Sequence, residues 1–317
     1  MLGTKIGLLL QELIDYLDPP YGESPEFYAD YEQKALKLIQ ANPRILKEQG
    51  GEEDNNVTPL IAAVMRGPRC CSVDLFKAMI LGSNVDAANK FGNRVIHYLA
   101  RNNRFEHLQV LLNAANEKKI KVDVNATTAV GDTAANLAAL EGASEALGLL
   151  TIVGKVDVNI VNAQKQSPLH VACFFGQPQG GKRETPITQE QAQRYLECID
   201  LLLLRGSEVN ARDEFGSTPV HCLVSVDIPE ELKTNALKLL IEHGADLTIK
   251  ANNLNTPVAM AKGYQFHEFS EIVQQEVVPS LRILAAKKLL EAKAQETTLF
   301  EDIANILKRL KLGKGQK

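Results

Sequence analysis

The sequence predicts an all-α fold, a solenoid of about six helix-turn-helix repeats with helical caps at its N- and C-terminal ends. Two recurring motifs and a near-average composition lead to this prediction. The first motif is Ser/Thr-Pro-aliphatic-His, which is complete at 167–170 and 218–221. Full and weaker copies begin at residues 58, 94, 133, 167, 218 and 256. Their separations of 36, 39, 34, 51 and 38 residues fit a period of about 33 residues with insertions.

The second motif recurs late in each unit and reads Gly-Ser-Glu-Val-Asn-Ala in its fullest copy. Its copies lie at 81–87, 122–126, 156–159, 206–211 and 244–247. Apolar runs at 198–204 and 236–241 stand just before two of these copies. We expect these runs to form the second helix of a unit, which then ends at Gly206 or Gly244 because glycine suits the position after a helix.

The first motif suits the start of a helix. Serine or threonine caps the helix, and proline fits its first position, where an N–H group would have no partner anyway. The small Ala-Ala pair at 62–63 lets the two helices of a unit approach closely. No single unit can bury its apolar face alone, so we expect stability to come from stacking on neighbouring units.

The two linked motifs resemble the ankyrin repeat, and the resemblance covers roughly residues 53–263. It implies a non-enzymatic interaction module or scaffold that binds a partner protein through its hairpin tips and concave groove. It also implies that His97, His170 and His221 bridge neighbouring loops by hydrogen bonds. The second and third units lack the full Thr-Pro pair, and Leu254 stands where the other hairpins often have glycine. We expect those units to be less regular.

Three insertions are predicted between the two helices of a unit, at 67–72, 177–191 and 226–232. Residues 1–52 have two helical patterns, 6–17 and 28–40, and we expect them to form a helical N-terminal cap. A separate acidic docking surface is the alternative. Residues 264–317 are expected to form a helical C-terminal segment that ends in a basic tail at 308–317. That tail is either solvated or a contact for an anionic membrane, nucleic acid or export machinery.

Composition limits the other function classes. A net charge of −4, from 35 basic and 39 acidic side chains, argues against a general nucleic-acid binder. The apolar stretch at 6–10 is too short for a signal-peptide core or a membrane span. We therefore expect a cytoplasmic monomer with reduced thiols, no integral membrane segment, no small-molecule substrate and no cofactor. Export without a cleavable signal peptide is the alternative.

Little in the sequence points to catalysis or metal binding. His170 with Cys173, and His221 beside Cys222, could together form a zinc site, but their spacing is unlike that of known zinc modules. A Cys-His nucleophile would have to use a cysteine outside the packed positions, such as Cys70 or Cys71. The segment at 180–182, Gly-Gly-Lys, lacks the other residues of a phosphate-binding loop.

Partner binding is expected at the hairpin tips and along the inner helices. Phe91 and Phe215 are aromatic residues flanked by charge, which is typical of a binding hot spot, although the alternative is that either ring folds back on its own hairpin. Phe174-Phe175 could form the floor of the groove, and we expect at least one of the two to be packed inside. The candidate partner-binding residues are Lys90, Phe91, Asn93, Arg101, Asp132, Gln164, Phe174, Phe175, Glu214 and Phe215. Two alternatives are a secreted bacterial ankyrin effector that binds a host protein, with an export signal in 296–317, and an ankyrin-bearing cysteine enzyme.

Overall fold

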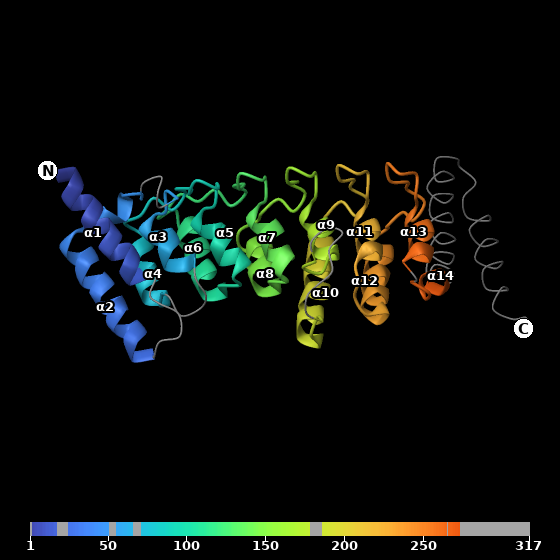
Figure 1. The fold of residues 1–317 in the computed structure, drawn as a ribbon, viewed down its shortest axis with the longest axis horizontal. Helices are drawn as coiled ribbons and strands as arrows, with labels where there is room; N and C mark the ends of the chain where they lie inside the picture. Colours follow the sequence, from blue (N-terminus) through green and yellow to red (C-terminus); the bar gives the residue numbers. More distant parts are fainter. Residues whose placement is uncertain are drawn as a thin grey trace, which may run out of the picture. The chain divides into compact units, whose positions relative to one another are not determined.

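A computed structural model of the chain describes residues 2–17, 25–50, 55–65, 71–177, 186–264 and 266–272. The chain forms two compact units, Met1–Gln265 and Phe266–Lys317. Within the described ranges the secondary structure is helical apart from one isolated bridge between Thr127 and Thr133. The predicted all-α solenoid is confirmed, and Figure 1 shows its helices arranged in successive pairs along the first unit.

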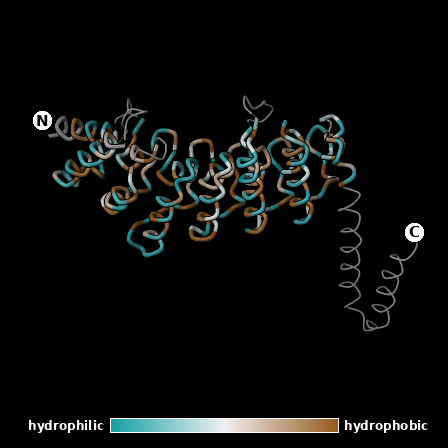
Figure 2. The backbone as a smooth tube through the Cα atoms, turned by 90° about the horizontal axis from the view of Figure 1, so that it is seen from below, coloured by the Kyte–Doolittle hydropathy of each residue, from teal (hydrophilic) through white to brown (hydrophobic). Residues whose placement is uncertain are grey.

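Each of the first five repeats pairs a short inner helix with an outer helix, and α13 is the inner helix of a sixth. The inner helices are α3 (Pro59–Met65), α5 (Val95–Arg101), α7 (Ala134–Glu141), α9 (Pro168–Cys173), α11 (Pro219–Ser225) and α13 (Pro257–Gly263). The outer helices are α4 (Val73–Ile80), α6 (Phe105–Asn116), α8 (Ser144–Ile152), α10 (Gln189–Leu204) and α12 (Glu230–Glu242). Successive inner helices pack on one another, and so do successive outer helices. The core is therefore continuous along the stack. Figure 2 shows hydrophobic and hydrophilic stretches alternating along the backbone of the stacked helices.

The inner helices begin where the first motif predicts. Pro168, Pro219 and Pro257 occupy the first turn of their helices. Thr133 caps α7, since its hydroxyl accepts a hydrogen bond from the backbone N–H of Asn136. A side-chain cap of this kind satisfies one of the helix's unpaired N–H groups and stabilises it by about 1 kcal/mol.

The repeated histidines link neighbouring units, as the resemblance implies. The Nδ1 atom of His97 accepts the N–H of Arg94 at 2.9 Å, and its Nε2 atom donates to the carbonyl of Ala126 in the next unit at 2.9 Å. His170 and His221 donate in the same way to the carbonyls of Ser217 and Asn255. Each of these rings is buried and bonded at both nitrogens, which makes its role structural.

Asn136 takes the place of the histidine in the third unit. Its Oδ1 atom accepts the N–H of Thr133 at 3.1 Å, and its Nδ2 atom donates to the carbonyl of Gln166 at 3.3 Å. The shorter amide thus makes the same two bonds as the imidazole. The third unit therefore keeps the bridge although it lacks the Thr-Pro-aliphatic-His motif.

Two of the predicted insertions are shorter than expected. α10 begins at Gln189, because Thr188 and Gln191 form a capping box, so the end of the 177–191 segment belongs to the helix. α12 likewise begins at Glu230, within the 226–232 segment. Residues 178–185 and 66–70, which include Cys70, lie outside the described part of the chain.

At the N-terminal end, α1 (Leu2–Leu17) and α2 (Pro25–Ala41) pack together and are followed by a 3-10 helix, η1 (Pro43–Lys47). α1 and η1 also pack on α3, and Leu13 and Leu17 are fully buried. This arrangement covers the first repeat. Among the described helices, none is both long and apolar enough to cross a bilayer.

In the second unit the structure describes α14 (Phe269–Ile272), in which the ring of Phe269 packs edge-on against Phe266 at 5.4 Å. The basic tail at 308–317 and the rest of the expected C-terminal helices lie outside the described residues.

Candidate partner-binding surface

The hairpin tips form a continuous row that the main chain holds together. In each junction, a backbone N–H near the start of one tip donates to a carbonyl of the preceding tip, at 2.8 to 3.0 Å. The donor and acceptor pairs are Lys90 to Asn55, Ala129 to Phe91, Ala163 to Val130, Glu214 to Gln164, and Asn252 to Phe215. Because these bonds involve backbone only, the side chains of the tips remain available to a partner.

The second to fifth tips are also closed on themselves by the side chain of their first residue. The Oδ1 atom of Asn89 accepts the N–H groups of Phe91 and Asn93, both at 3.0 Å. Asp213 does the same for Phe215 at 2.9 Å and Ser217 at 2.8 Å. The tips are therefore ordered by local hydrogen bonds as well as by contacts with the next unit.

The two predicted tip aromatics point into solvent instead of folding back on their hairpins. Phe91 is 53% exposed and Phe215 is 51% exposed. The ammonium group of Lys90 lies 5.1 Å from the centroid of the Phe91 ring, within the range of a cation–π contact. Glu214 and Gln164 are exposed on their own tips. The tip row thus presents two aromatic rings, together with polar side chains and the exposed apolar side chains of Val130 and Leu254.

Arg101 projects from α5 on the inner side of the stack. Its Nε atom donates to the Oε1 atom of Glu141, on α7, at 3.0 Å. Both side chains are largely exposed, so the pair contributes little to stability. It fixes the position of a positive and a negative group beside the neighbouring units.

Phe174 and Phe175 are both buried, so at least one of the two rings is packed inside as expected, and they do not form an open groove floor. Phe175 is fully buried, and its ring lies 5.4 Å from that of Tyr195 on α10. Its φ of 51° turns the chain so that the side chain enters the core. Phe175 therefore cannot contact a partner, whereas Phe174, at 6% exposed, reaches the edge of a small hollow.

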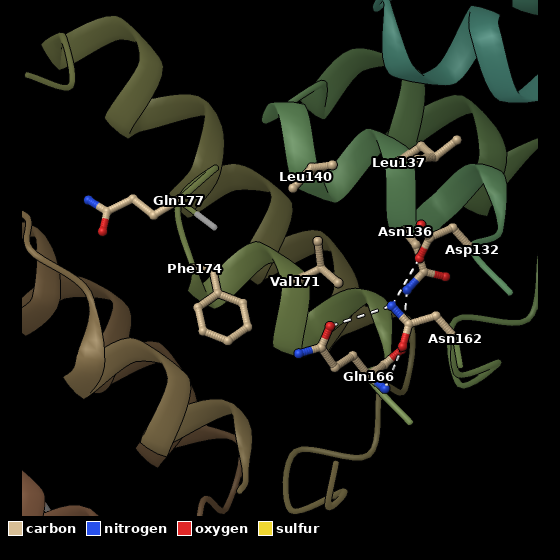
Figure 3. A pocket seen from close by; sticks show the side chains of 9 residues that line it. All are labelled: Asp132, Asn136, Leu137, Leu140, Asn162, Gln166, Val171, Phe174 and Gln177. Atoms are coloured by element: carbon tan, nitrogen blue, oxygen red, sulfur yellow. Dashed lines mark hydrogen bonds between the residues drawn. The ribbon is translucent and has the colours of Figure 1, made fainter. Parts of the chain in front are cut away.

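This hollow, of about 170 Å³, lies between the third and fourth units and is shown in Figure 3. Its polar side comes from the two hairpins and its apolar side from α7, α9 and the residue after α9. The lining residues are Asp132, Asn136, Leu137, Leu140, Asn162, Gln166, Val171, Phe174 and Gln177. Of the predicted site residues, only Asp132 and Phe174 meet here.

Sequence reasoning missed Asn162 and Val171, because it treated each unit separately. Asn162 opens the fourth tip, and its Nδ2 atom reaches back to the Oδ1 atom of Asp132 in the third tip at 3.0 Å. Asn162 could have been found from the sequence, because it stands at the start of its tip in the same position as Asn89 and Asp213.

Burial dominates the electrostatics of Asp132. Desolvation raises the pKa of this carboxyl, while the hydrogen bond from Asn162 and the charge of Arg101 lower it by smaller amounts. The carboxyl group is thus partly removed from water, which disfavours its charged form.

The described cysteines offer no reactive thiolate. Burial raises the pKa of Cys198 to about 12 and raises the pKa values of Cys173 and Cys222 well above the usual range. Cys71 is buried as well. Thiols of this kind are inert as nucleophiles. In the described ranges, no group of three His, Cys, Asp or Glu side chains is placed to hold a metal ion.

Comparison with known proteins agrees with the repeat assignment. The family model for the ankyrin repeat matches residues 164–214. An ankyrin repeat protein of Rickettsia bellii is 28% identical over 122 residues, which is 37% of this chain and 49% of the relative. The yeast (Saccharomyces cerevisiae) protein "Target of rapamycin complex 2 subunit AVO2" is 23% identical over 232 residues, or 69% of this chain and 46% of the relative.

A human relative, "Ankyrin repeat and SOCS box protein 16", is 38% identical over 79 residues, which cover 24% of this chain and 16% of that protein. The chain therefore spans half or less of the length of these curated relatives. The crystal structure of EF0377, an ankyrin repeat protein, superimposes with a TM-score of 0.53 at 23% identity. That likeness covers 64% of this chain and 92% of EF0377, and at this identity it speaks for the fold.

The sequence motifs, the paired helices, the histidine bridges and the comparisons all lead to the same assignment. We conclude that this chain folds as an ankyrin-repeat solenoid and carries a recognisable ankyrin repeat at residues 164–214.

Proposed function

We propose that the chain is a non-enzymatic interaction module that binds a partner protein through its hairpin tips and concave face. The observation that carries this proposal is the exposure of Phe91 and Phe215 on tips that are fixed by backbone hydrogen bonds. Large aromatic side chains supply much of the binding energy in protein interfaces. A surface that is already ordered loses little conformational entropy when it binds.

The proposed contact surface follows the tip row and then the inner helices. Lys90, Asn93, Gln164 and Glu214 would surround the two rings, and Arg101, Asp132 and Phe174 would extend the surface along the concave face. The high pKa values of the described thiols support a role without covalent catalysis. We further propose that the protein acts as a monomer in the cytoplasm, where buried thiols stay reduced.

To test this proposal, a partner is captured from a cell lysate and purified, and its affinity for the wild-type chain is compared with its affinity for tip variants. Phe91→Ala and Phe215→Ala should each weaken binding by about 1–4 kcal/mol, as aromatic hot-spot residues do, with little change in thermal stability. Leu204→Ala is the control, because Leu204 is an exposed apolar residue on α10, outside the tips. It should leave the affinity unchanged.

Removal of residues 308–317 separates this proposal from binding by the basic tail. The module should keep its affinity at physiological salt without the tail. If both alanine variants bind fully while tail removal causes a strongly salt-dependent loss, the function belongs to the tail, since only exposed charge contacts weaken with ionic strength.

A bacterial effector that binds a host protein is the second candidate. It rests on the organisation of the sequence, in which degenerate repeats are followed by a non-repeat segment with a lysine-rich C-terminus. In that case a reporter fused to residues 296–317 should be exported by a bacterium that delivers such effectors, and the same reporter without the segment should stay inside. Retention of both reporters would contradict an export signal in this segment.

A further inference from the structure

The hollow between α7 and α9 has an incompletely paired carboxylate at its polar end. The Oδ1 atom of Asp132 accepts a hydrogen bond from Asn162 at 3.0 Å. Within the described ranges, no donor reaches the Oδ2 atom of Asp132, and the residue forms no salt bridge. A half-buried carboxylate with one free oxygen favours a hydrogen-bond donor that carries positive charge.

Arg101, whose charge acts on Asp132, forms its salt bridge with another carboxylate. Arg101 is close enough to lower the pKa of Asp132, but its Nε atom is bonded to Glu141 at 3.0 Å. The side-chain oxygen of Gln166 lies on the same polar side and accepts only a long bond of 3.4 Å from Asn162. Two oxygen atoms can therefore receive donors from a bound group.

The opposite side of the hollow is apolar. Leu137, Val171 and Phe174 line it, and each is almost completely buried by the protein itself. Figure 3 shows Val171 and Phe174 on α9 and its C-terminal end, with Leu137 and Leu140 across from them. Such a wall can cover the methylene stem of a long side chain while its charged end meets the polar side.

Size and charge identify the occupant. At about 170 Å³ the hollow is smaller than the roughly 300–1,000 Å³ of most small-molecule sites, so it suits one side chain of a larger ligand. An acidic side chain would be repelled by the Asp132 carboxylate, and a purely apolar one would cover its Oδ2 atom without supplying a donor. A lysine or arginine side chain satisfies both sides.

We propose that this hollow is a subsite for one basic side chain, lysine or arginine, of a protein partner. The aliphatic stem lies along Val171 and Phe174, and the cationic end donates to Asp132 and Gln166. The inference rests on the proposed function and deepens it, since it states the chemistry that a partner segment must present on the concave face.

Short peptides test the subsite without knowledge of the partner. The probes are acetyl-Gly-Gly-X-Gly-Gly-amide, where X is arginine, lysine, citrulline or norleucine, titrated into the full chain and followed by NMR. The arginine and lysine peptides should shift the side-chain amide signals of Asn162 and Gln166. Citrulline, which keeps the shape of arginine without its charge, and norleucine, which keeps only the stem, should bind at least about tenfold more weakly.

Two matched variants complete the test. Asp132→Asn should weaken the arginine peptide about tenfold or more, because it removes the charge and keeps the shape. Asp74→Asn makes the same change at an exposed position on α4 and should have no effect. Both variants should keep the wild-type unfolding temperature to within a few degrees.

Equal binding of the citrulline and arginine peptides, or full binding by Asp132→Asn, would overturn the subsite. So would the absence of any shift at Asn162 and Gln166. None of these results bears on the tip row, whose role is judged by partner affinity of the Phe91 and Phe215 variants. Failure of the subsite and failure of the proposed function are therefore distinguishable.

Discussion

The hydroxyl group of Tyr195 donates to the carbonyl oxygen of Leu140 at 2.9 Å, which ties the long outer helix α10 to the end of the inner helix α7. Tyr195 is buried, and its ring lies close to Gly142 and Gly176. Both glycines have a positive φ, 64° and 68°. The aromatic ring thus occupies space that side chains on these two turns would otherwise need.

Gly176→Ala should be clearly more destabilising than an ordinary glycine substitution. An alanine there must adopt a left-handed conformation, which costs about 1–2 kcal/mol, and its Cβ would also collide with the phenol of Tyr195, at about 1–3 kcal/mol more. Gly206→Ala is the control, because Gly206 has a φ of 83° but no heavy atom within 4 Å of the added Cβ. Urea unfolding measures both, and equal losses would show that Tyr195 moves aside freely.

The stability of the array should fall as the pH drops below about 6.5. Burial lowers the pKa of His97 to about 4, and it also lowers the pKa values of His107, His170 and His221. Between the unfolded and folded pKa values, the unfolded chain binds more protons than the folded chain, so acid favours unfolding. The contribution of His97 is fully present above pH 6.5, and about 3 kcal/mol of it is lost by pH 4.

His97→Asn tests the origin of this pH dependence. Asparagine makes the corresponding two bonds in the third unit at Asn136, so the variant can keep the bridge to Ala126 without a titrating ring. The free energy of unfolding, measured by urea at pH 7, 5.5 and 4, should depend less steeply on pH in the variant. An unchanged slope would mean that His97 does not contribute to the acid sensitivity.

Leu202 and Leu204 should differ sharply in their effect on stability. Leu202 is fully buried, and Leu204, two residues later on α10, is 65% exposed. Leu202→Ala leaves a cavity and should cost about 2–5 kcal/mol, whereas Leu204→Ala should stay within about 0.5 kcal/mol. Denaturant unfolding of the two variants checks this. Similar losses would mean that α10 packs on a different face.

The start of each inner helix was predictable from the sequence because the signals are local. Thr218 and Pro219, for example, cap and begin α11 within two residues, and His221 completes the cap one turn later. The same locality explains why the histidine bridges agree with the resemblance. A motif whose hydrogen bonds form within one helical turn can be recognised from its own residues, because these bonds need no distant part of the chain.

The candidate site was less predictable because it depends on contacts between units. Phe175 turns inward to meet Tyr195, which comes twenty residues later on a helix extended by part of an insertion. The polar side of the hollow likewise combines Asn162 of the fourth tip with Asp132 of the third, which are joined by a hydrogen bond. Neither relationship has a fixed spacing in the sequence, so neither could be read from a repeat pattern.

Leu254→Gly should stabilise the sixth hairpin. Leu254 has a φ of 66° and occupies the place that Gly216 takes in the fifth tip. A leucine held in the left-handed region destabilises the folded state by about 1–2 kcal/mol, and glycine removes this strain. Glycine also has more conformational freedom in the unfolded chain, which lowers the free energy of unfolding by about 0.5–1 kcal/mol. We expect a net increase of about 0.5–1 kcal/mol in the free energy of unfolding, measured by urea.

The exposure of Leu254 and a parallel substitution at Lys165 allow this prediction to be tested against backbone strain alone. Leu254 is 75% exposed, so its side chain contributes little burial that glycine would forfeit. Lys165 has a φ of 58° at the corresponding place in the fourth tip, and Lys165→Gly should show a similar gain. If Lys165→Gly stabilises the protein and Leu254→Gly destabilises it, backbone strain is not what sets the stability of the sixth tip, and the leucine side chain must itself hold that tip in place.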